Sequence, residues 1–342
     1  METNELTQYK GVWCCAEVRR GALVAAIFEL LHAGRKLADQ LGEPLCAVLV
    51  GNGVKKWTND LIEAGAEKVY VLDHPALENF VDETHAQALA VAIRQAKPSV
   101  FLVSASTAGR SLASRLGVTL NTGAGADVSE LSVETLVNGT TNAQVCAVRS
   151  THGGNLFASI VFPKARPIVI SVRPMAFPRA EKIAGKTGEI IDIALNPSEW
   201  KVRTKFVQFM PEENADLDIG SADKIVAAGR GLGKAEGFGM VRAFAKILGA
   251  AVGASRAAVD AGWITYRHQV GLTGRTVRPK LYIALGISGQ VQHLAGMGQS
   301  ETIVAINKDP DCPLMKVASL SVEADLYEFI PLVIEKLKQQ KN

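Results

Sequence analysis

Residues 224–233 read KIVAAGRGLG, and this stretch is the first unit of an α/β pattern that continues through the rest of the sequence. The apolar run Lys224–Ala228 is typical of a buried parallel strand. The glycine-rich loop 229–233 follows at once, and such loops let backbone amides approach a phosphate. The full spacing Gly-x-Gly-x-x-Gly is absent, so this loop alone is weak evidence for a nucleotide site.

The alternation of strands and helices continues from this loop to the C-terminus. Strand patterns cover Ala251–Gly253, Leu281–Leu285 and Thr302–Asn307, and helical patterns cover Ala235–Leu248, Arg256–Ala261, the region around Gln292–Ala295, and Leu326–Lys338. This order predicts a smaller, doubly wound parallel-sheet domain over residues 211–342.

The N-terminal part predicts a larger, Rossmann-like α/β domain over residues 1–210. Its strand patterns are Gly11–Glu17, Cys46–Gly51, Lys68–Leu72 and Ser99–Ser104, with helical patterns at Ala22–Leu41 and Thr84–Ala96 and further strands at Gln144–Arg149, Leu156–Phe162 and Ile168–Val172. Prolines and the acidic run 212–216 loosen the pattern, which places the boundary between residues 205 and 220. A length of 342 residues also favours two domains.

Composition excludes several classes of function. The net charge of +3 is small and its cations are dispersed, so no nucleic-acid partner is expected. No apolar run reaches the roughly 18 residues of a membrane span. The acidic, polar start lacks the features of a leader peptide, so we expect a cytoplasmic protein without stable membrane insertion.

The five cysteines form an odd set without a Cys-x-x-Cys pair. Neither a disulfide framework nor a metal site is therefore expected. Cys14, Cys15, Cys46 and Cys146 lie in strand-like apolar runs, where a thiol usually packs as a small hydrophobic group.

Glycine-rich loops recur after the predicted strands of the second domain. Of the 31 glycines, 15 lie between Gly220 and Gly298. Loops 253–258, 268–274 and 286–293 each place hydroxyl, amide or cationic groups where a strand ends, which is where ligands bind in open α/β sheets. Tight turns could explain any one loop, but the set favours a ligand site.

Four longer runs, 252–263, 269–274, 287–297 and 303–309, resemble the signature of electron-transfer flavoprotein α subunits. The resemblance is dense in the C-terminal domain and looser in the N-terminal one. It implies that the C-terminal domain binds one FAD. By family position, the cofactor-binding residues are Arg230, Ser255, Arg256, Gln269, Val270, Gly271, Leu272, Thr273, Ser288, Gly289, Gln290, Val291, Gln292, His293, Asn307, Asp325 and Leu326.

The resemblance also implies roles around the flavin ring. Arg256 and His293 are the family's residues for the N1–C2=O edge and face, where a cation or an imidazole donor stabilises negative charge. A cationic His293 should help mainly in acid, unless its neutral N–H is the donor. Thr273 offers a hydroxyl near N5. For His293 the alternative is an ordinary loop histidine.

The remaining family positions concern the rest of the cofactor. Arg230, Ser255 and Ser288 match residues that hold the ring edge or the pyrophosphate, and the backbone of Gly289 to Gln292 can wrap the phosphates. Asn307 and Asp325 match residues of the adenosine half, where a carboxylate suits ribose hydroxyls. Asp325 is equally well explained as a charge at the start of the last helix.

Two departures from the family pattern stand out. Leu272 occupies a position where the family often has Gln, which removes one amide from the flavin's neighbourhood. The segment 149–155 differs from the usual Arg-Pro-aromatic version ahead of its two glycines. That segment faces the partner subunit in the family, so flavin contacts from the partner side are in doubt.

The family implies a heterodimer with an electron-transfer flavoprotein β subunit, which carries AMP or a second FAD. Electrons would pass from NADH or an acyl-CoA dehydrogenase, as in fatty acid β-oxidation, to another flavoprotein or a quinone reductase. We expect an electron carrier rather than a stand-alone enzyme, with NADH oxidation if the heterodimer is of the electron-bifurcating bacterial type. Two alternatives are a flavin-dependent reductase component acting with an acyl-CoA dehydrogenase, and a nucleotide-binding sensor module.

Overall fold

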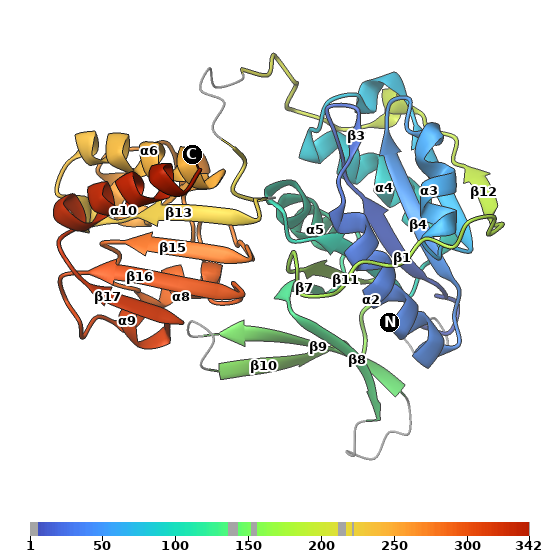
Figure 1. Cartoon of the computed structure of the whole chain (residues 1–342). Coiled ribbons are helices and arrows are strands. Elements are labelled where there is room, and N and C mark those ends of the chain that lie inside the picture. The colour runs from blue at the N-terminus through green and yellow to red at the C-terminus, as the bar shows by residue number, and fades with distance from the viewer. Residues whose placement is uncertain (1–5, 136–142, 152–155, 211–216, 221, 342) are drawn as a thin grey trace. The chain divides into compact units, whose positions relative to one another are not determined.

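The computed structural model describes residues 6–135, 143–151, 156–210, 217–220 and 222–341. The chain forms two compact units, and the division between them falls between Phe209 and Met210. Each unit is built on a parallel sheet with helices on both faces (Figure 1). The predicted fold class, α/β in two domains with the smaller one at the C-terminus, is confirmed.

The N-terminal unit contains a seven-stranded, fully parallel sheet. Its order is β12 (Glu189–Asp192), β5 (Lys68–Asp73), β4 (Leu45–Gly51), β1 (Val12–Ala16), β6 (Val100–Ser104), β11 (Ile168–Val172) and β7 (Ala124–Val128). Helices α2 (Ala26–Leu41) and α3 (Thr58–Glu63) pack on one face, and α4 (Asp82–Ala96) and α5 (Thr107–Thr119) pack on the other. Because both faces are covered, the central strands are apolar throughout.

Smaller elements modify the predicted pattern of this unit. The predicted helix Ala22–Leu41 starts later, at Ala26, because the hairpin of β2 (Val18–Arg19) and β3 (Ala22–Leu23) precedes it. An antiparallel sheet of β8 (Glu130–Thr135), β9 (Ala143–Thr151) and β10 (Leu156–Val161) accounts for two further predicted strands.

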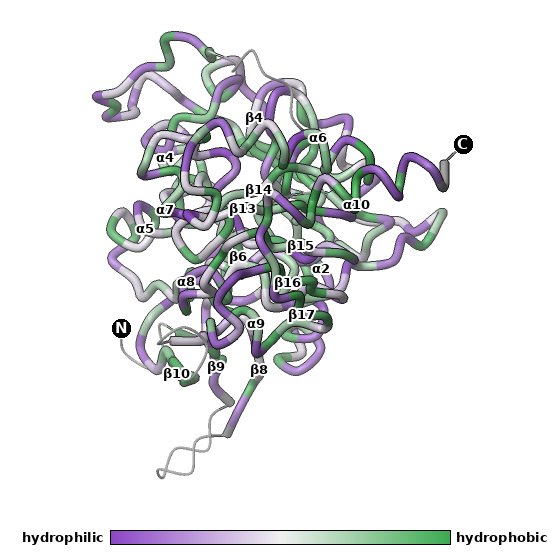
Figure 2. The backbone as a smooth tube through the Cα atoms, turned by 60° about the vertical axis from the view of Figure 1, so that its left-hand side comes forward, coloured by the Kyte–Doolittle hydropathy of each residue, from purple (hydrophilic) through white to green (hydrophobic). Residues whose placement is uncertain are grey.

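The C-terminal unit contains a five-stranded parallel sheet. Its order is β14 (Ala251–Ala254), β13 (Lys224–Ala228), β15 (Leu281–Leu285), β16 (Thr302–Asn307) and β17 (Leu320–Glu323). Helices α6 (Phe238–Leu248), α7 (Arg256–Asp260) and α10 (Leu326–Lys341) pack on one face, and α8 (Val291–Met297) and α9 (Pro313–Val317) pack on the other. Apolar and polar residues alternate along helix α10 in Figure 2, as expected for a helix with one buried face.

The order of these strands creates a reversal beside β13. From β13 the chain moves outward to β14 on one side and then returns to β15 on the other side. Loops that follow β13 and β15 therefore diverge at the carboxyl edge, and ligands of open α/β sheets bind at such a switch point. The strand order alone therefore predicts a ligand site at the carboxyl edge of the sheet, beside β13.

All five cysteines are buried and free of disulfides. Cys14 and Cys15 lie in β1, Cys46 in β4 and Cys146 in β9, as predicted for small hydrophobic groups. Burial raises the pKa of Cys15 and of Cys46 to about 12, so both remain thiols at neutral pH. Among the helices of the described residues, none combines the length and apolar character of a membrane span.

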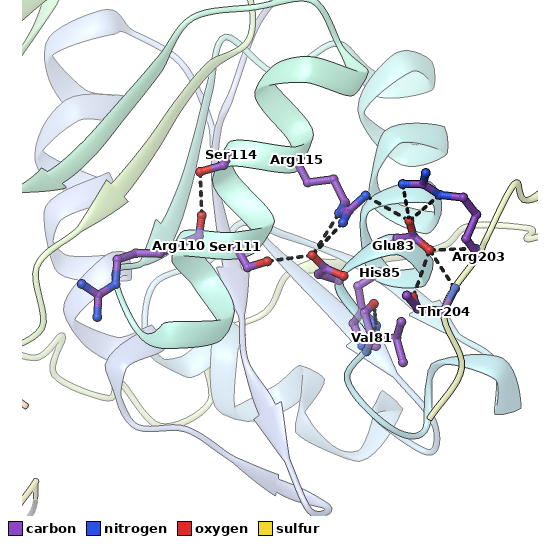
Figure 3. Close-up of polar contacts among 10 residues, drawn as sticks. Val81, Glu83, His85, Arg110, Ser111, Ser114, Arg115, Arg203 and Thr204 are labelled. Atoms are coloured by element: carbon purple, nitrogen blue, oxygen red, sulfur yellow. Dashed lines mark hydrogen bonds and ion pairs between the residues drawn. The ribbon is translucent and has the colours of Figure 1, made fainter. Parts of the chain in front are cut away.

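A buried carboxylate ties the last segment of the N-terminal unit to helix α4 (Figure 3). Glu83 Oε2 accepts hydrogen bonds from the backbone amides of Arg203, at 2.7 Å, and Thr204, at 3.0 Å, and from the Thr204 hydroxyl, at 2.9 Å. Arg115 of α5 contacts the other oxygen at 3.4 Å. The hydrogen bond from the Arg203 amide is the largest of the contributions that lower the pKa of Glu83 to about 2.

Replacing this carboxylate should loosen the segment that it holds. In Glu83→Gln we expect trypsin to cleave after Lys201, Arg203 or Lys205 several-fold faster than in the wild type. The carboxylate's contribution is fully present above about pH 4.5 and is lost as the pH falls toward about 2, because the folded-state pKa is the lower one. Equal cleavage rates for the variant and the wild type would contradict the assignment.

Glu199→Gln is the matched control. Glu199 lies close by in sequence and accepts a hydrogen bond from Asn196, and among the described residues it forms no hydrogen bond or ion pair with Arg203 or Thr204. Its replacement should leave the cleavage rate in 201–205 unchanged.

Candidate functional site

The carboxyl ends of β13, β14, β15 and β16 surround a cavity of about 660 Å³, which we call the sheet-edge cavity. Most of the predicted cofactor residues line it. They are Arg230, Ser255, Arg256, Gln269, Val270, Gly271, Leu272, Thr273, Ser288, Gln290, Gln292, His293 and Asn307. The structure thus brings together side chains from loops that lie up to 77 positions apart in the sequence, from 230 to 307.

Three glycines let the loops after β13 and β15 pack backbone against backbone where they leave the sheet. A Cβ atom on Gly231 would lie 2.6 Å from the Gly286 Cα atom, and one on Gly229 would lie 2.5 Å from the Gly286 oxygen. Gly286 also adopts a φ of +59°, which favours glycine. No larger residue fits at this contact without moving a main chain. Beyond the contact the two loops diverge, and the cavity lies between them.

The loop 269–275 forms a second wall. Gln269 is buried and its Nε2 donates to the Thr273 hydroxyl at 3.0 Å, while the Leu272 amide donates to the Gln292 carbonyl at 2.8 Å. Because the Thr273 oxygen accepts this bond, its own proton is available to a ligand. Leu272, at 44% exposure, adds an apolar side chain where the family often has an amide.

His293 lies in α8 and is buried at the cavity wall, with 6% of its surface exposed. Its Nε2 lies 3.0 Å from the hydroxyl of Tyr282. Its Nδ1 is buried and has no partner of hydrogen-bonding geometry among the described residues. Burial lowers the pKa of His293 to about 4, and the opposing effect of the Val270 backbone does not offset it.

The lowered pKa determines the charge of the His293 ring. A histidine with a pKa of about 4 is neutral across the physiological range. Of the two forms considered from the sequence, a cationic ring in mild acid and a neutral ring, this pKa favours the neutral one. The physical reason is the burial of its side chain between α8 and Tyr282 of β15, which the sequence does not reveal.

Charged side chains mark the open side of the cavity. Arg256 begins α7, and its Nε lies 3.2 Å from the Asp260 carboxylate one turn later. Both side chains are largely exposed, so the pair is weak and leaves the guanidinium free to reorient. Arg230 is exposed and makes no ion pair within the described ranges, and it lies where anionic groups would enter.

Four predicted residues lie outside the lining. Gly289 packs behind the wall, where a Cβ would lie 2.4 Å from the Leu314 amide, and Val291 is exposed. Asp325 precedes α10, accepts from the Tyr327 amide at 2.7 Å and pairs with Lys308 at 2.5 Å. The alternative interpretation of Asp325 as a helix N-terminal charge is thus realised, and Leu326 is buried in the core beside it.

Several lining residues were not named among the predicted cofactor residues, although most of them lie in the glycine-rich loops and family runs described above. They are Gly231, Ala257, Asp260, Gly286, Ile287, Asp309 and Cys312. Asp260 could have been found from its spacing of four after Arg256. The segment 149–155, which departs from the family pattern, falls partly on residues 152–155, and these lie outside the described residues.

The residues present fit a dinucleotide that carries an aromatic ring system. The cavity volume lies within the range of small-molecule sites, and most of its wall is apolar with a few convergent polar groups. The neutral imidazole of His293 adds a ring to the wall, while its Nδ1 is buried near the Val270 backbone. The two arginines suit a diphosphate or an electron-rich ring edge.

Comparisons with known proteins agree with this geometry. Residues 12–198 match the family profile of the electron transfer flavoprotein domain, and residues 218–298 match that of the electron transfer flavoprotein FAD-binding domain. The electron transfer flavoprotein subunit alpha of Thermoanaerobacterium thermosaccharolyticum is 44% identical over 98% of this chain and 100% of the relative.

Two further relatives extend the comparison. The electron transfer flavoprotein subunit alpha of Megasphaera elsdenii is 43% identical over 99% of each chain. The acryloyl-CoA reductase electron transfer subunit beta of Anaerotignum propionicum is 34% identical over 99% of this chain and 98% of the relative. The similarity therefore spans both units.

The glycine contact should be intolerant of a single methyl group. We expect Gly231→Ala to destabilise the protein by about 1–3 kcal/mol, since the added Cβ meets main-chain atoms that cannot easily give way. Gly239→Ala in α6 is the control, because nothing lies within 4 Å of its Cβ position. Denaturant unfolding of both variants checks this, and equal midpoints would show that the contact is not tight.

Proposed function

The chain belongs to the electron transfer flavoprotein family, among its α subunits, and from that premise we propose that it is a cytoplasmic electron carrier with one FAD in the sheet-edge cavity. The observation that carries the proposal is the convergence of family-matched side chains on one cavity at the switch point of the sheet. FAD supplies the one- and two-electron chemistry, and the protein supplies binding, orientation and electrostatics.

We assign each loop of this chain its own part in binding the cofactor. The loops after β13 and β15 bring backbone amides to the pyrophosphate, with Arg230, Ser255 and Ser288 beside it. Arg256 provides a positive charge, and His293 provides a neutral imidazole at the ring edge. Asn307 serves the adenosine half, and so does Asp325 if its carboxylate, which lies outside the lining, exchanges its contact with Lys308 for one with the ribose. The apolar wall and Leu272 keep water from the ring.

The proposal extends to partners. We propose a heterodimer with an electron-transfer flavoprotein β subunit that holds AMP or a second FAD, with the N-terminal unit, residues 1–210, facing that subunit. The donor is NADH or an acyl-CoA dehydrogenase, and the acceptor is another flavoprotein or a quinone reductase. The name of the Anaerotignum propionicum relative favours, as a second candidate, an electron-transfer component of an acyl-CoA reductase complex.

The deciding measurement is the number of flavins per co-purified heterodimer. One FAD with AMP supports simple electron transfer, and two FAD support the NADH-oxidising, bifurcating type. Absence of flavin would favour a nucleotide-binding sensor instead. Turnover of an enoyl-CoA by the heterodimer alone would favour a reductase, because a pure carrier has no substrate pocket of its own.

Flavin binding should reside in the C-terminal unit. We expect residues 206–342 to keep one FAD after removal of residues 1–205, provided that the partner is present, since every lining residue of the cavity lies after Gly229. Absorbance at the flavin bands against protein concentration measures the ratio, and circular dichroism verifies folding. A folded complex without flavin would refute the assignment of the cofactor to this unit.

Arg256 and His293 should affect the potential of the bound flavin without a strong dependence on pH. Arg256→Ala should lower the first one-electron potential by tens of millivolts or more, because a charge–anion contact is worth on the order of 1–4 kcal/mol. His293→Ala should lower it by a smaller amount that is constant from about pH 6 to about pH 9, since the ring is neutral throughout.

Lys246→Ala is the control for this redox titration. It removes the same charge from the same unit but lies on α6, outside the lining of the cavity. A His293→Ala effect that grows steadily from pH 9 to pH 6 would show that a cationic imidazole acts in the site after all.

A further inference from the structure

The wall loop 269–275 carries two cavity-facing side chains at a tip that has little rigidity of its own. Leu272 and Thr273 are exposed and line the cavity, and Gly271 and Gly274 flank this pair. Gly271 adopts a φ of +145°, and a Cβ atom on Gly274 would overlap the Gln269 oxygen, so both positions need glycine. The Gly274 amide donates to the Gly271 carbonyl at 3.1 Å, but this bond stays within the tip. Contacts from outside must therefore fix the direction of the tip.

Two hydrogen bonds hold the tip from the side of the cavity. The Gln269 side-chain amide donates to the Thr273 hydroxyl at 3.0 Å, and the Leu272 amide donates to the Gln292 carbonyl at 2.8 Å. An oxygen that accepts one hydrogen bond in this way keeps its own proton for another acceptor. Neither bond involves the Thr273 carbonyl, so the peptide group that follows Thr273 has to be held from the other side.

Tyr266 ties this outer side of the tip to the body of the unit. Its hydroxyl donates to the Thr273 carbonyl and has no other hydrogen-bond partner among the described residues. Its backbone belongs to the short 3-10 helix η7 (Tyr266–His268). This helix is anchored to β14, because His268 is buried and its Nδ1 lies 2.8 Å from the Val252 carbonyl. Tyr266 thus reaches the tip from a fixed base.

We propose that Tyr266 is a positioning residue: its hydroxyl fixes the peptide group of Thr273, and with it the direction in which the Thr273 hydroxyl offers its proton to a ligand in the sheet-edge cavity. The Thr273 side chain is exposed at the lining, so a ligand can reach it. A hydroxyl donor suits an acceptor nitrogen or a carbonyl oxygen of a bound heterocycle. Identifying that heterocycle with flavin rests on the proposed function, whereas the tie between Tyr266 and the loop does not.

The directional nature of hydrogen bonds makes this tie consequential. A hydrogen bond weakens steeply when the angle at its proton falls below about 120°. A tip that samples several orientations presents the Thr273 proton correctly for only part of the time, and the apparent affinity for the ligand falls by that fraction. Tyr266 itself lies outside the lining. It therefore acts on the affinity through Thr273 and without touching the ligand.

The first measurement is hydrogen exchange in the heterodimer after its flavin has been removed, which reads the loop without the cofactor. The amides of Leu272 and Gly274 are bonded in the closed loop, and a loosened tip exposes them. In Tyr266→Phe we expect them to exchange about two- to tenfold faster than in the wild type, as for the loss of one neutral hydrogen bond. The variant should fold, because it keeps the ring and the side chain is 63% exposed.

The second measurement separates positioning from a general effect on the stability of the loop. Tyr266→Phe should weaken FAD binding about two- to fivefold in the wild-type background. It should leave the affinity unchanged in a Thr273→Val background, which keeps the main-chain acceptor but has no hydroxyl to direct. A tyrosine that merely stabilised the loop would give the same fold-change in both backgrounds.

Tyr327→Phe is the matched control. It also removes one hydroxyl from an exposed tyrosine of the same unit, and this hydroxyl donates to the Leu232 carbonyl at 2.7 Å. Leu232 lies outside the lining of the cavity. Both the exchange of the loop amides and the affinity for FAD should therefore match the wild type.

Two results would overturn the role of Tyr266. Unchanged exchange in Tyr266→Phe would show that the hydroxyl does not hold the tip. Equal losses of FAD affinity in the two backgrounds would show that the effect does not pass through the Thr273 hydroxyl. Absence of FAD from the wild-type heterodimer would instead count against the proposed function, while the exchange rates would still decide whether Tyr266 holds the loop.

Discussion

The close approach of two backbones, at Gly231 and Gly286, is the constraint on which the C-terminal unit depends. Strands β13 and β15 are neighbours in the sheet, so the loops that follow them start side by side. At this point their main chains pack directly against each other, with no side chain between them. Two walls of the cavity begin at this contact. The loop after β13 carries Arg230, and the loop after β15 leads into α8 and His293. Because Gly231 and Gly286 have no side chains, the two loops can approach closely here and leave room for a large cofactor beyond.

The polar groups of the cavity are charged on its exposed side and neutral on its buried side. Guanidinium groups lie at the open side, where solvent lowers the free energy needed to keep them charged. On the buried side the polar group is an imidazole that burial keeps neutral, anchored through Tyr282 to the central sheet. The free energy of desolvation favours this arrangement, in which charged groups lie near solvent and a neutral polar group lies near the core.

Sequence patterns predicted the central strands well, because each is a continuous apolar run buried on both faces. They missed β17, whose residues are largely exposed at the sheet edge, and α5, whose small and polar residues give little periodicity. The loops of the site were recognisable from glycines and family motifs. The burial of His293 was not, since its ring meets Tyr282, eleven positions away, only after the sheet has formed.

The buried cysteines have a practical consequence for spectroscopy. All five native thiols lie inside the two units, and those of β1 and β4 are held protonated by burial. Maleimide and methanethiosulfonate reagents attack accessible thiolates, so the native chain should remain largely unlabelled. A single cysteine introduced on the surface of each unit would then carry a spin label or a fluorophore. Distances between the two units could be measured during electron transfer in a protein that keeps its natural core.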